Sequence, residues 1–487
     1  MQENFYTTDS EALGGLMGLY STVLKGGVRE NFIVRNEACS DLLTYKPVAA
    51  AEAVSYVKYI LTSERVNVVG SWNHCYSVIN GSNAYIRSLS DNENISKDKR
   101  EQYIKEARFF RALMYYHLVM RWGDVPLRTT PTNMKNTDIA RSPADEVWSQ
   151  VIEDLTEASS LPEKSNTPNG RISRGLVYTL LAKVYLIKKD YQNAANTLDK
   201  ITGYSLMSNI NDVWNIRQKY NKESIWEINC EPGTLPKQDN FMLSFYLPVY
   251  PDFKGTNATY PVNDYLLMLT EQNSPRSKYF YSKKIKTNEV TSTYKGEYEY
   301  TDASGKNVKI IFTNATMPAY AHLMKFADLS NNGTNFETGN SPFNIIIFRY
   351  ADVLLMQAEA ECELNGKTAK ALEYLNLIRK RAGETLYTIT NESGLRPLNN
   401  QEDMREAIRN ERALELVGEG HRFYDLKRWG NQYALTKLRE SRQAHIAGTN
   451  FCYNPEDLTN IEEHKLLWPI PEEEMRGNKL MIQNDKY

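Results

Sequence analysis

The charged residues best suited to chemistry lie in one stretch near the C-terminal end, residues 408–430, whose sequence is IRNERALELVGEGHRFYDLKRWG. Glu411 and Glu415 are four residues apart, so a helix would place both carboxylates on one face. Two carboxylates can hydrolyse a glycosidic bond when they flank a sugar at the right separation. The alternative, which we favour, is that they pair with Arg412 and Arg422 and fix the packing of helices.

Histidine and cysteine show no spacing that is typical of a metal site or a catalytic nucleophile. The six histidines are His74, His117, His322, His421, His445 and His464. No two are spaced like zinc ligands on a helix. The five cysteines are Cys39, Cys75, Cys230, Cys362 and Cys452. No Cys-x-x-Cys pair occurs, and a scattered, odd set is typical of free, buried thiols. We therefore expect no metal, no cofactor and no catalytic residue.

Aromatic residues gather in a proline-rich stretch in the middle of the chain. Tyr246, Tyr250, Phe253 and Tyr260 lie there, and six of the 18 prolines fall within residues 232–275. Rings on such a loop are harder to bury than rings on a helix face, so we expect them to be exposed. Ring faces beside polar side chains are what a small-ligand site needs, and sugars present flat apolar faces edged by hydroxyls. The alternative is that these rings anchor the loop itself.

Helical patterns dominate the remainder of the chain. The stretches expected to be helical are 9–25, 50–90, 100–122 and 143–160. Residues 181–201 and, more divergently, 351–381 resemble tetratricopeptide helix pairs, in which small residues allow two antiparallel helices to approach closely. Residues 224–229 alternate like a strand, and residues 294–300 and 308–313 flank a turn, which predicts a hairpin.

Composition excludes several classes of protein. There are 58 Lys and Arg against 60 Asp and Glu, a net charge of −2, and a general nucleic-acid binder has a basic excess instead. The longest apolar runs are a few residues, whereas a membrane-spanning helix needs about 18. The first residues lack the basic and apolar pattern of an export signal. We expect either an intracellular protein or a mature chain without its export segment.

Five collinear segments together resemble the SusD/RagB family, the surface glycan-binding lipoproteins of Bacteroidetes. The segments are FYTTDSEALGGLMGLY at 5–20, EARFFRALMYYHLVMRWGDVPL at 106–127, FRYADVLLMQAEAECELNG at 348–366, the stretch 408–430 and LWPIPEEEMRGNKLMIQND at 467–485. They cover nearly the whole chain, and their combination is specific to that family.

The resemblance implies a mainly α fold, with a tetratricopeptide-like scaffold of helix pairs and a loop-rich, partly β variable region. It implies one globular unit, residues 1–487. The scaffold would comprise about 9–205 and 343–430, the variable ligand face about 206–342, and an irregular C-terminal segment 431–487. The signal and the lipid-bearing cysteine of such proteins do not occur in this sequence, so we interpret the chain as a trimmed form.

The resemblance also implies a function without catalysis. Such proteins are anchored to the outer membrane by a lipid, bind an oligosaccharide or polysaccharide, and deliver it to a SusC-like TonB-dependent transporter. Two alternatives stay open: a helical-repeat scaffold that binds a peptide or protein partner, and import of a nutrient other than a glycan.

The ligand-binding residues that we expect come from the proline-rich stretch and three other places. Trp72, in a region that lies beside the ligand face in the family, either stacks on sugar or anchors the start of a helix. Glu37, Asp41 and Tyr45 lie in a preceding loop that could contribute from the other side. Tyr298 lies on a strand of the predicted hairpin, where it forms a platform for sugar or stabilises the hairpin.

Overall fold

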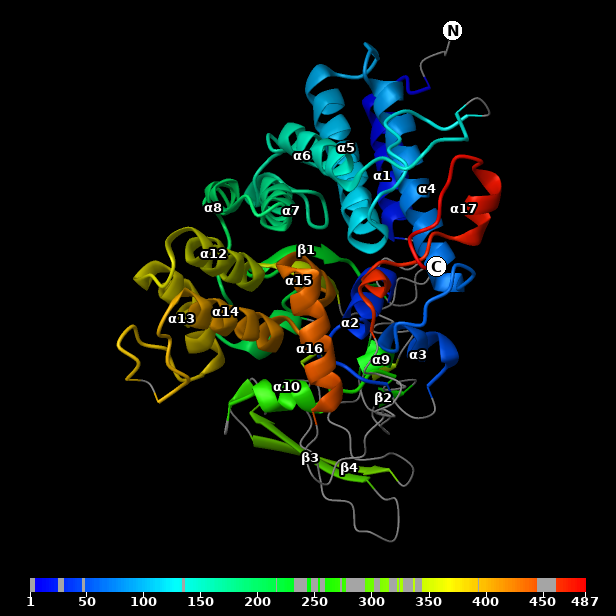
Figure 1. The fold of residues 1–487 in the computed structure, drawn as a ribbon. Helices are drawn as coiled ribbons and strands as arrows, with labels where there is room; N and C mark the ends of the chain where they lie inside the picture. Colours follow the sequence, from blue (N-terminus) through cyan, green and yellow to red (C-terminus); the bar gives the residue numbers. More distant parts are fainter. Residues whose placement is uncertain are drawn as a thin grey trace. The chain divides into compact units, whose positions relative to one another are not determined.

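The computed structural model divides the chain into two compact units, where the resemblance predicts a single one. One unit comprises residues 1–32, 60–203 and 462–487, and the other comprises residues 33–59 and 204–461. The structure describes residues 5–24, 30–45, 49–133, 136–215, 217–231, 243–246, 253–254, 259–271, 274–276, 294–301, 307–314, 322–323, 325–326, 336–337, 344–392, 394–444 and 461–487. Figure 1 shows the elements of both units in chain order.

The first unit is a helical assembly built around α5. Its helices are α1 (Asp9–Leu24), α4 (Val66–Leu89), α5 (Lys97–Trp122), α6 (Ala144–Ala158), α7 (Arg174–Ile187), α8 (Tyr191–Leu198) and α17 (Glu472–Gly477), with short 3₁₀ turns η2 (Lys164–Asn166) and η6 (Glu463–Leu466). Helix α5 packs against α1, α4, α6 and α7. Phe109, Phe110 and Leu113 are buried, as a helix with two apolar faces requires.

The second unit combines helices with short sheets. Its helices are α2 (Arg35–Ala38), α3 (Ala51–Val57), α9 (Leu243–Tyr246), α10 (Asp264–Leu269), α12 (Tyr350–Asn365), α13 (Ala369–Ala382), α14 (Gln401–Leu416), α15 (Arg422–Trp429) and α16 (Asn431–Gln443), with the 3₁₀ turn η3 (Ile210–Trp214). The π-helical turn η1 (Glu30–Val34) begins in the first unit and ends in the second.

Three strand pairs belong to the second unit. Strand β1 (Ser224–Ile228) pairs antiparallel with β6 (Ile345–Arg349), and β2 (Phe253–Lys254) pairs parallel with β5 (Phe336–Glu337). Strands β3 (Tyr294–Thr301) and β4 (Asn307–Asn314) form an antiparallel pair in which Tyr298 lies opposite Ile310. The predicted strand 224–229 and the predicted hairpin are therefore confirmed.

The predicted tetratricopeptide-like pairs are present as α7 with α8 and α12 with α13. Asp190 caps α8 by accepting a hydrogen bond from the Asn193 amide at 3.1 Å. In the second pair, Ala351, Ala358 and Ala371 are fully buried in one apolar core. Small side chains at these positions let the two helices lie close together. The mainly α fold class is thus confirmed.

The expected irregularity of residues 431–487 is wrong, because α16 and α17 lie within them. Helix α16 buries Ala434, Leu435 and Leu438 on one face. These three apolar residues follow the helical spacing i, i+1 and i+4, but the surrounding residues are polar, so the signal was weak.

Two further expectations concern cysteines and the membrane. Cys75 and Cys362 are free and buried as predicted, Cys39 and Cys230 are buried as well, and Cys452 lies outside the described residues. Among the helices that the structure describes, none combines the length and the apolar character that crossing a bilayer requires.

Candidate functional site

The structure brings together two segments of the second unit that were expected to contribute to a ligand site from different sides. Leu43 and Val262 form an antiparallel bridge, and the Thr44 amide donates to the Pro261 carbonyl at 2.9 Å. The Asn263 side chain donates to the Asp41 carbonyl at 2.7 Å. The segment 41–45 therefore lies beside residues 261–263, immediately after the aromatic stretch.

The two ends of residues 247–258 are held close to each other. The amide of Tyr260 donates to the carbonyl of Phe245 at 2.9 Å, and the two rings stack with centroids 6.0 Å apart. Arg35 donates to the Tyr260 hydroxyl at 2.7 Å and lies over the rings of Phe245 and Tyr56 at 5.3 and 5.1 Å. We call this arrangement of Arg35, Phe245 and Tyr260 the loop base.

The expectation that Tyr246 and Tyr260 are exposed is wrong, because both are fully buried. The Tyr246 ring stacks on Phe326 at 5.8 Å, and the Tyr260 ring belongs to the loop base. Both rings therefore anchor the aromatic stretch, which was the alternative left open for loop aromatics. Their burial leaves neither of them a free face for a ligand in this structure.

Two of the remaining expected residues, Asp41 and Tyr45, are also buried. Asp41 accepts two hydrogen bonds from Arg422, both at 2.8 Å, so it serves a buried ion pair. Tyr45 is 7% exposed, and its ring lies 5.9 Å from the ammonium of Lys58. Both residues therefore support the segment next to the loop base instead of presenting side chains at the surface.

In the first unit, Trp72 is 1% exposed and contacts other aromatic rings. It lies edge-on to Trp122 at 5.2 Å and tilted against Tyr76 at 5.0 Å. Of the two readings given for Trp72, the structure favours the helix anchor, because stacking on sugar requires an open ring face.

Part of the expected set cannot be placed. Tyr250 and the side chains of Phe253 and Tyr298 lie outside the described residues, although the backbones of Phe253 and Tyr298 form strands β2 and β3. A ligand-binding role for these three residues stays a prediction.

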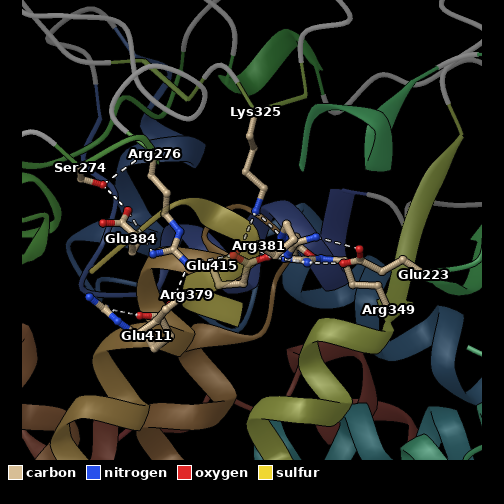
Figure 2. Close-up of polar contacts among 11 residues, drawn as sticks. Glu223, Ser274, Arg276, Lys325, Arg349, Arg379, Arg381, Glu384, Glu411 and Glu415 are labelled. Atoms are coloured by element: carbon tan, nitrogen blue, oxygen red, sulfur yellow. Dashed lines mark hydrogen bonds and ion pairs between the residues drawn. The ribbon is translucent and has the colours of Figure 1, made fainter. Parts of the chain in front are cut away.

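The carboxylates that could have been catalytic lie instead in a buried charged cluster, shown in Figure 2. Glu411 pairs with Arg276 and, at 2.8 Å, with Arg379. Glu415 pairs with Arg276 at 3.1 Å, with Arg349 at 2.7 Å and with Arg381. Both glutamates are at most 1% exposed.

Arg349, at the end of β6, is the centre of this cluster. Its guanidinium donates to Glu415 at 2.7 Å, to Glu223 at 2.9 Å and to both carboxylate oxygens of Glu419 at 2.7 and 2.8 Å. Lys325 bonds to the same Glu419 at 2.5 Å. The cluster thereby joins strand β6, helix α14 and the segment that carries Lys325 (Figure 2).

The electrostatics of the cluster argue against acid–base catalysis. Burial alone would raise the pKa of Glu415, but the guanidinium groups of Arg381, Arg349 and Arg276 outweigh it and hold this pKa far below its ordinary value. A general acid in glycoside hydrolysis needs a raised pKa and contact with substrate. Glu415 has neither, so its chemistry here is that of a structural ion pair.

The prediction that these glutamates pair with arginines is confirmed, but the predicted partners are wrong. Arg412 pairs with Asp352 and Asp425 at 2.9 Å each, and Arg422 pairs with Asp41. The actual partners come from residues 32 to 139 positions away along the chain. Several of them lie in segments without helical periodicity, so no local pattern could have indicated them.

A metal site finds no support among the residues that the structure describes. No group of three or more His, Cys, Asp or Glu side chains there is arranged to hold an ion. His117 is partly buried in α5, and its ring stacks on Phe32 at 3.9 Å. Burial, assisted by Arg121 and His74, lowers the pKa of His117 well below its ordinary value, so this histidine is a neutral core residue.

The chain belongs to the SusD family, whose model matches residues 76–487. The SusD-like protein P25 of Formosa agariphila is 27% identical over 99% of this chain and 92% of its own length. A laminarin-binding SusD-like protein of known structure is 25% identical, with a TM-score of 0.75 over 99% of this chain and all of that one. A SusD homologue from Bacteroides thetaiotaomicron superimposes with a TM-score of 0.81 at 21% identity, over 99% of this chain and 98% of that one.

Proposed function

We propose that this protein binds an oligosaccharide or polysaccharide at the outer cell surface and delivers it, uncut, to a SusC-like TonB-dependent transporter. The observation that carries the proposal is membership of the SusD family together with similarity over the whole chain to a laminarin-binding relative. In this proposal a lipid attached to the precursor holds the protein on the outer membrane.

The proposal places the ligand at residues carried by the loop base. Residues 247–258 begin and end there, and they contain Tyr250 and Phe253. The buried rings of Tyr246 and Tyr260 fix the ends of this stretch. Capture needs no chemical step, and each contact with a sugar is weak because hydroxyl groups exchange water for protein at little net gain.

The absence of catalysis is part of the proposal, and burial of the two candidate carboxylates supports it. Glu411→Gln should leave the glycan uncut, as in the unchanged protein, and lower the free energy of unfolding by about 1–3 kcal/mol through weaker bonds to Arg276 and Arg379. Reducing-sugar assays and urea unfolding measure the two effects. Sugar release that disappears in this variant would establish a hydrolase instead.

The first experiment is a binding screen against a panel of polysaccharides, including laminarin, by affinity electrophoresis and then calorimetry. Selective binding of an uncut glycan is expected. Tyr250→Ala should weaken that binding at least severalfold with no change in unfolding. Phe5→Ala, which removes an aromatic ring that is 80% exposed in the first unit, is the matched control and should bind normally. Binding of no glycan, or binding of a peptide, would overturn the proposal.

A further inference from the structure

One buried carboxyl of the second unit forms no ion pair with the arginines of the charged cluster. Glu37, in α2, is fully buried. Its Oε2 accepts a hydrogen bond from the Gly420 amide at 3.0 Å, and the nearby Gly418 amide favours the ionised carboxylate. Its Oε1 has no hydrogen-bond partner among the described residues. A buried charge with an unsatisfied oxygen is costly, so this environment favours the neutral acid.

The turn that faces Glu37 has a fixed backbone. Gly418 and Gly420 both have φ of +81°, a conformation that other residues rarely adopt. A Cβ added to Gly418 would lie 2.3 Å from Leu323 and 2.9 Å from Phe326, which is too close for any side chain. Gly418 therefore packs closely against Leu323 and Phe326, and the turn lies next to the Glu37 carboxyl.

The charged neighbours of Glu37 already have other partners. The groups that face it, or that lie on the segments packed around it, are Lys325, Asp41, Tyr246, Arg35, His322, Glu419, His421 and Arg422. Lys325 is paired with Glu419 at 2.5 Å, and Asp41 with Arg422 at 2.8 Å.

Burial is consequently the largest influence on the pKa of Glu37. It raises the pKa of the carboxyl from 4.5 to about 7, against the lowering effects of the two glycine amides and Lys325. Because burial raises this pKa, the stability of the closed arrangement with a neutral Glu37 is fully present below about pH 4.5 and is lost as the pH rises through about 7.

We propose that Glu37 is a proton-operated latch between α2 and the turn 417–421: the two pack together while the buried carboxyl is neutral, and loss of its proton, which leaves a charge buried at this contact, favours their separation. The latch adjoins the loop base, because α2 carries Arg35 and leads directly into segment 41–45. The effect of the latch on capture or release of ligand rests on the proposed function. The existence of the latch does not rest on that function.

Amide hydrogen exchange of the turn tests the latch without any ligand. Peptides that contain Gly418 and Gly420 are followed by mass spectrometry between pH 4.5 and 7.5, with rates corrected for the intrinsic effect of pH. Glu37→Gln keeps the shape of the neutral acid but cannot ionise. The opening constant is the ratio of the open to the closed form of the turn. Its value in the unchanged protein, divided by its value in Glu37→Gln, should rise about tenfold per pH unit. The total rise should be about 300-fold.

This ratio isolates Glu37 because all other titratable groups are the same in both proteins. Glu373→Gln, at an exposed position of α13, removes one negative charge and should follow the unchanged protein at every pH. A ratio that does not change with pH overturns the latch.

Infrared difference spectra of the unchanged protein give a second readout that needs no variant. A protonated carboxyl band that disappears with a midpoint near pH 7 is expected, since ordinary carboxyl groups are already ionised there. Absence of that band overturns the latch even where Glu37→Gln fails to fold. Failure to bind any glycan would instead overturn the proposed function, and neither latch readout depends on it.

Discussion

Each of the two compact units contains a buried cluster, and the two clusters differ in chemistry. In the first, Trp72, Trp122 and Trp468 meet edge to face at 5.2 and 5.4 Å, and Arg121 lies 4.3 Å from the Trp468 ring. In the second, Arg349 and Glu415 are fully buried at the centre of an ion-pair cluster. The aromatic cluster depends on removal of apolar surface from water, and the ion-pair cluster depends on the charges of its members.

This difference has a physical consequence for each unit. Aromatic rings pack through many weak contacts that do not depend on pH. A buried ion pair gains little net stability over apolar residues, but removal of one partner leaves an uncompensated charge. The ion pairs also have fixed directions, so they specify how β6, α14 and the segment of Arg276 pack. The second unit should therefore be the more easily broken by a single charge change.

The largest effect is expected for Arg349→Met. This change leaves Glu223, Glu415 and Glu419 buried without their shared cation. We expect a loss of about 5 kcal/mol in the free energy of unfolding, measured by urea denaturation. Arg396→Met breaks an exposed ion pair with Asp403 and should cost less than about 1 kcal/mol. Equal losses in the two variants would contradict a charge-dependent core.

Trp122→Ala is the matching change in the first unit. Trp122 is fully buried, and its indole nitrogen donates to the Pro469 carbonyl at 2.9 Å. Loss of the ring removes apolar contacts and leaves a cavity, for an expected cost of about 3–4 kcal/mol. Urea unfolding at pH 4 and pH 7 should give the same difference from the unchanged protein. A strong pH dependence would show that the comparison between the units is wrong.

Lowering the pH should reduce the loss in free energy of unfolding that Arg349→Met causes. This reduction should be smaller than the effects of the two substitutions above. Neighbouring cations, against the effect of burial, lower the pKa values of Glu415 and Glu419 in the intact cluster. Stability from these groups is present above their ordinary value near 4.5 and is lost as the pH falls below it. The difference between variant and unchanged protein should therefore narrow from pH 5 to pH 3. If the difference in free energy of unfolding is the same at pH 5 and pH 3, the cost of Arg349→Met comes from lost packing.

The smallest effect is expected for Tyr265→Phe. The Tyr265 hydroxyl donates to Glu440 at 3.3 Å, and this glutamate is exposed, so water can replace the lost partner. We expect a change of less than about 1 kcal/mol in the free energy of unfolding. A larger loss would show that polar contacts at the edge of the second unit matter as much as its charged cluster.

The helices could be predicted from the sequence because their signals are local. The apolar stripe around Phe109 predicts α5 at nearly its observed bounds, Lys97–Trp122. Helix α16 was missed because only Ala434, Leu435 and Leu438 mark its buried face. The pairing of Glu411 and Glu415 with arginines was predictable from charge alone, but their partners were not.

The candidate site was harder to predict than the fold. Aromatic content directed attention to residues around 245–260, but it could not tell an anchor from a binding surface. Tyr260 is buried because Arg35, 225 residues earlier, donates to its hydroxyl. Such long-range contacts have no sequence pattern, so exposure of a loop aromatic depends on partners that only the structure reveals.

The loop base has a consequence for how this protein could acquire a new ligand. Since the Tyr260 amide and the Phe245 carbonyl bring the two ends together, the chain between them can be exchanged as a cassette. Doubling the length of such an insert adds only about 0.6 kcal/mol of closure entropy. Selection can therefore change the length and composition of residues 247–258 while the framework keeps its stability.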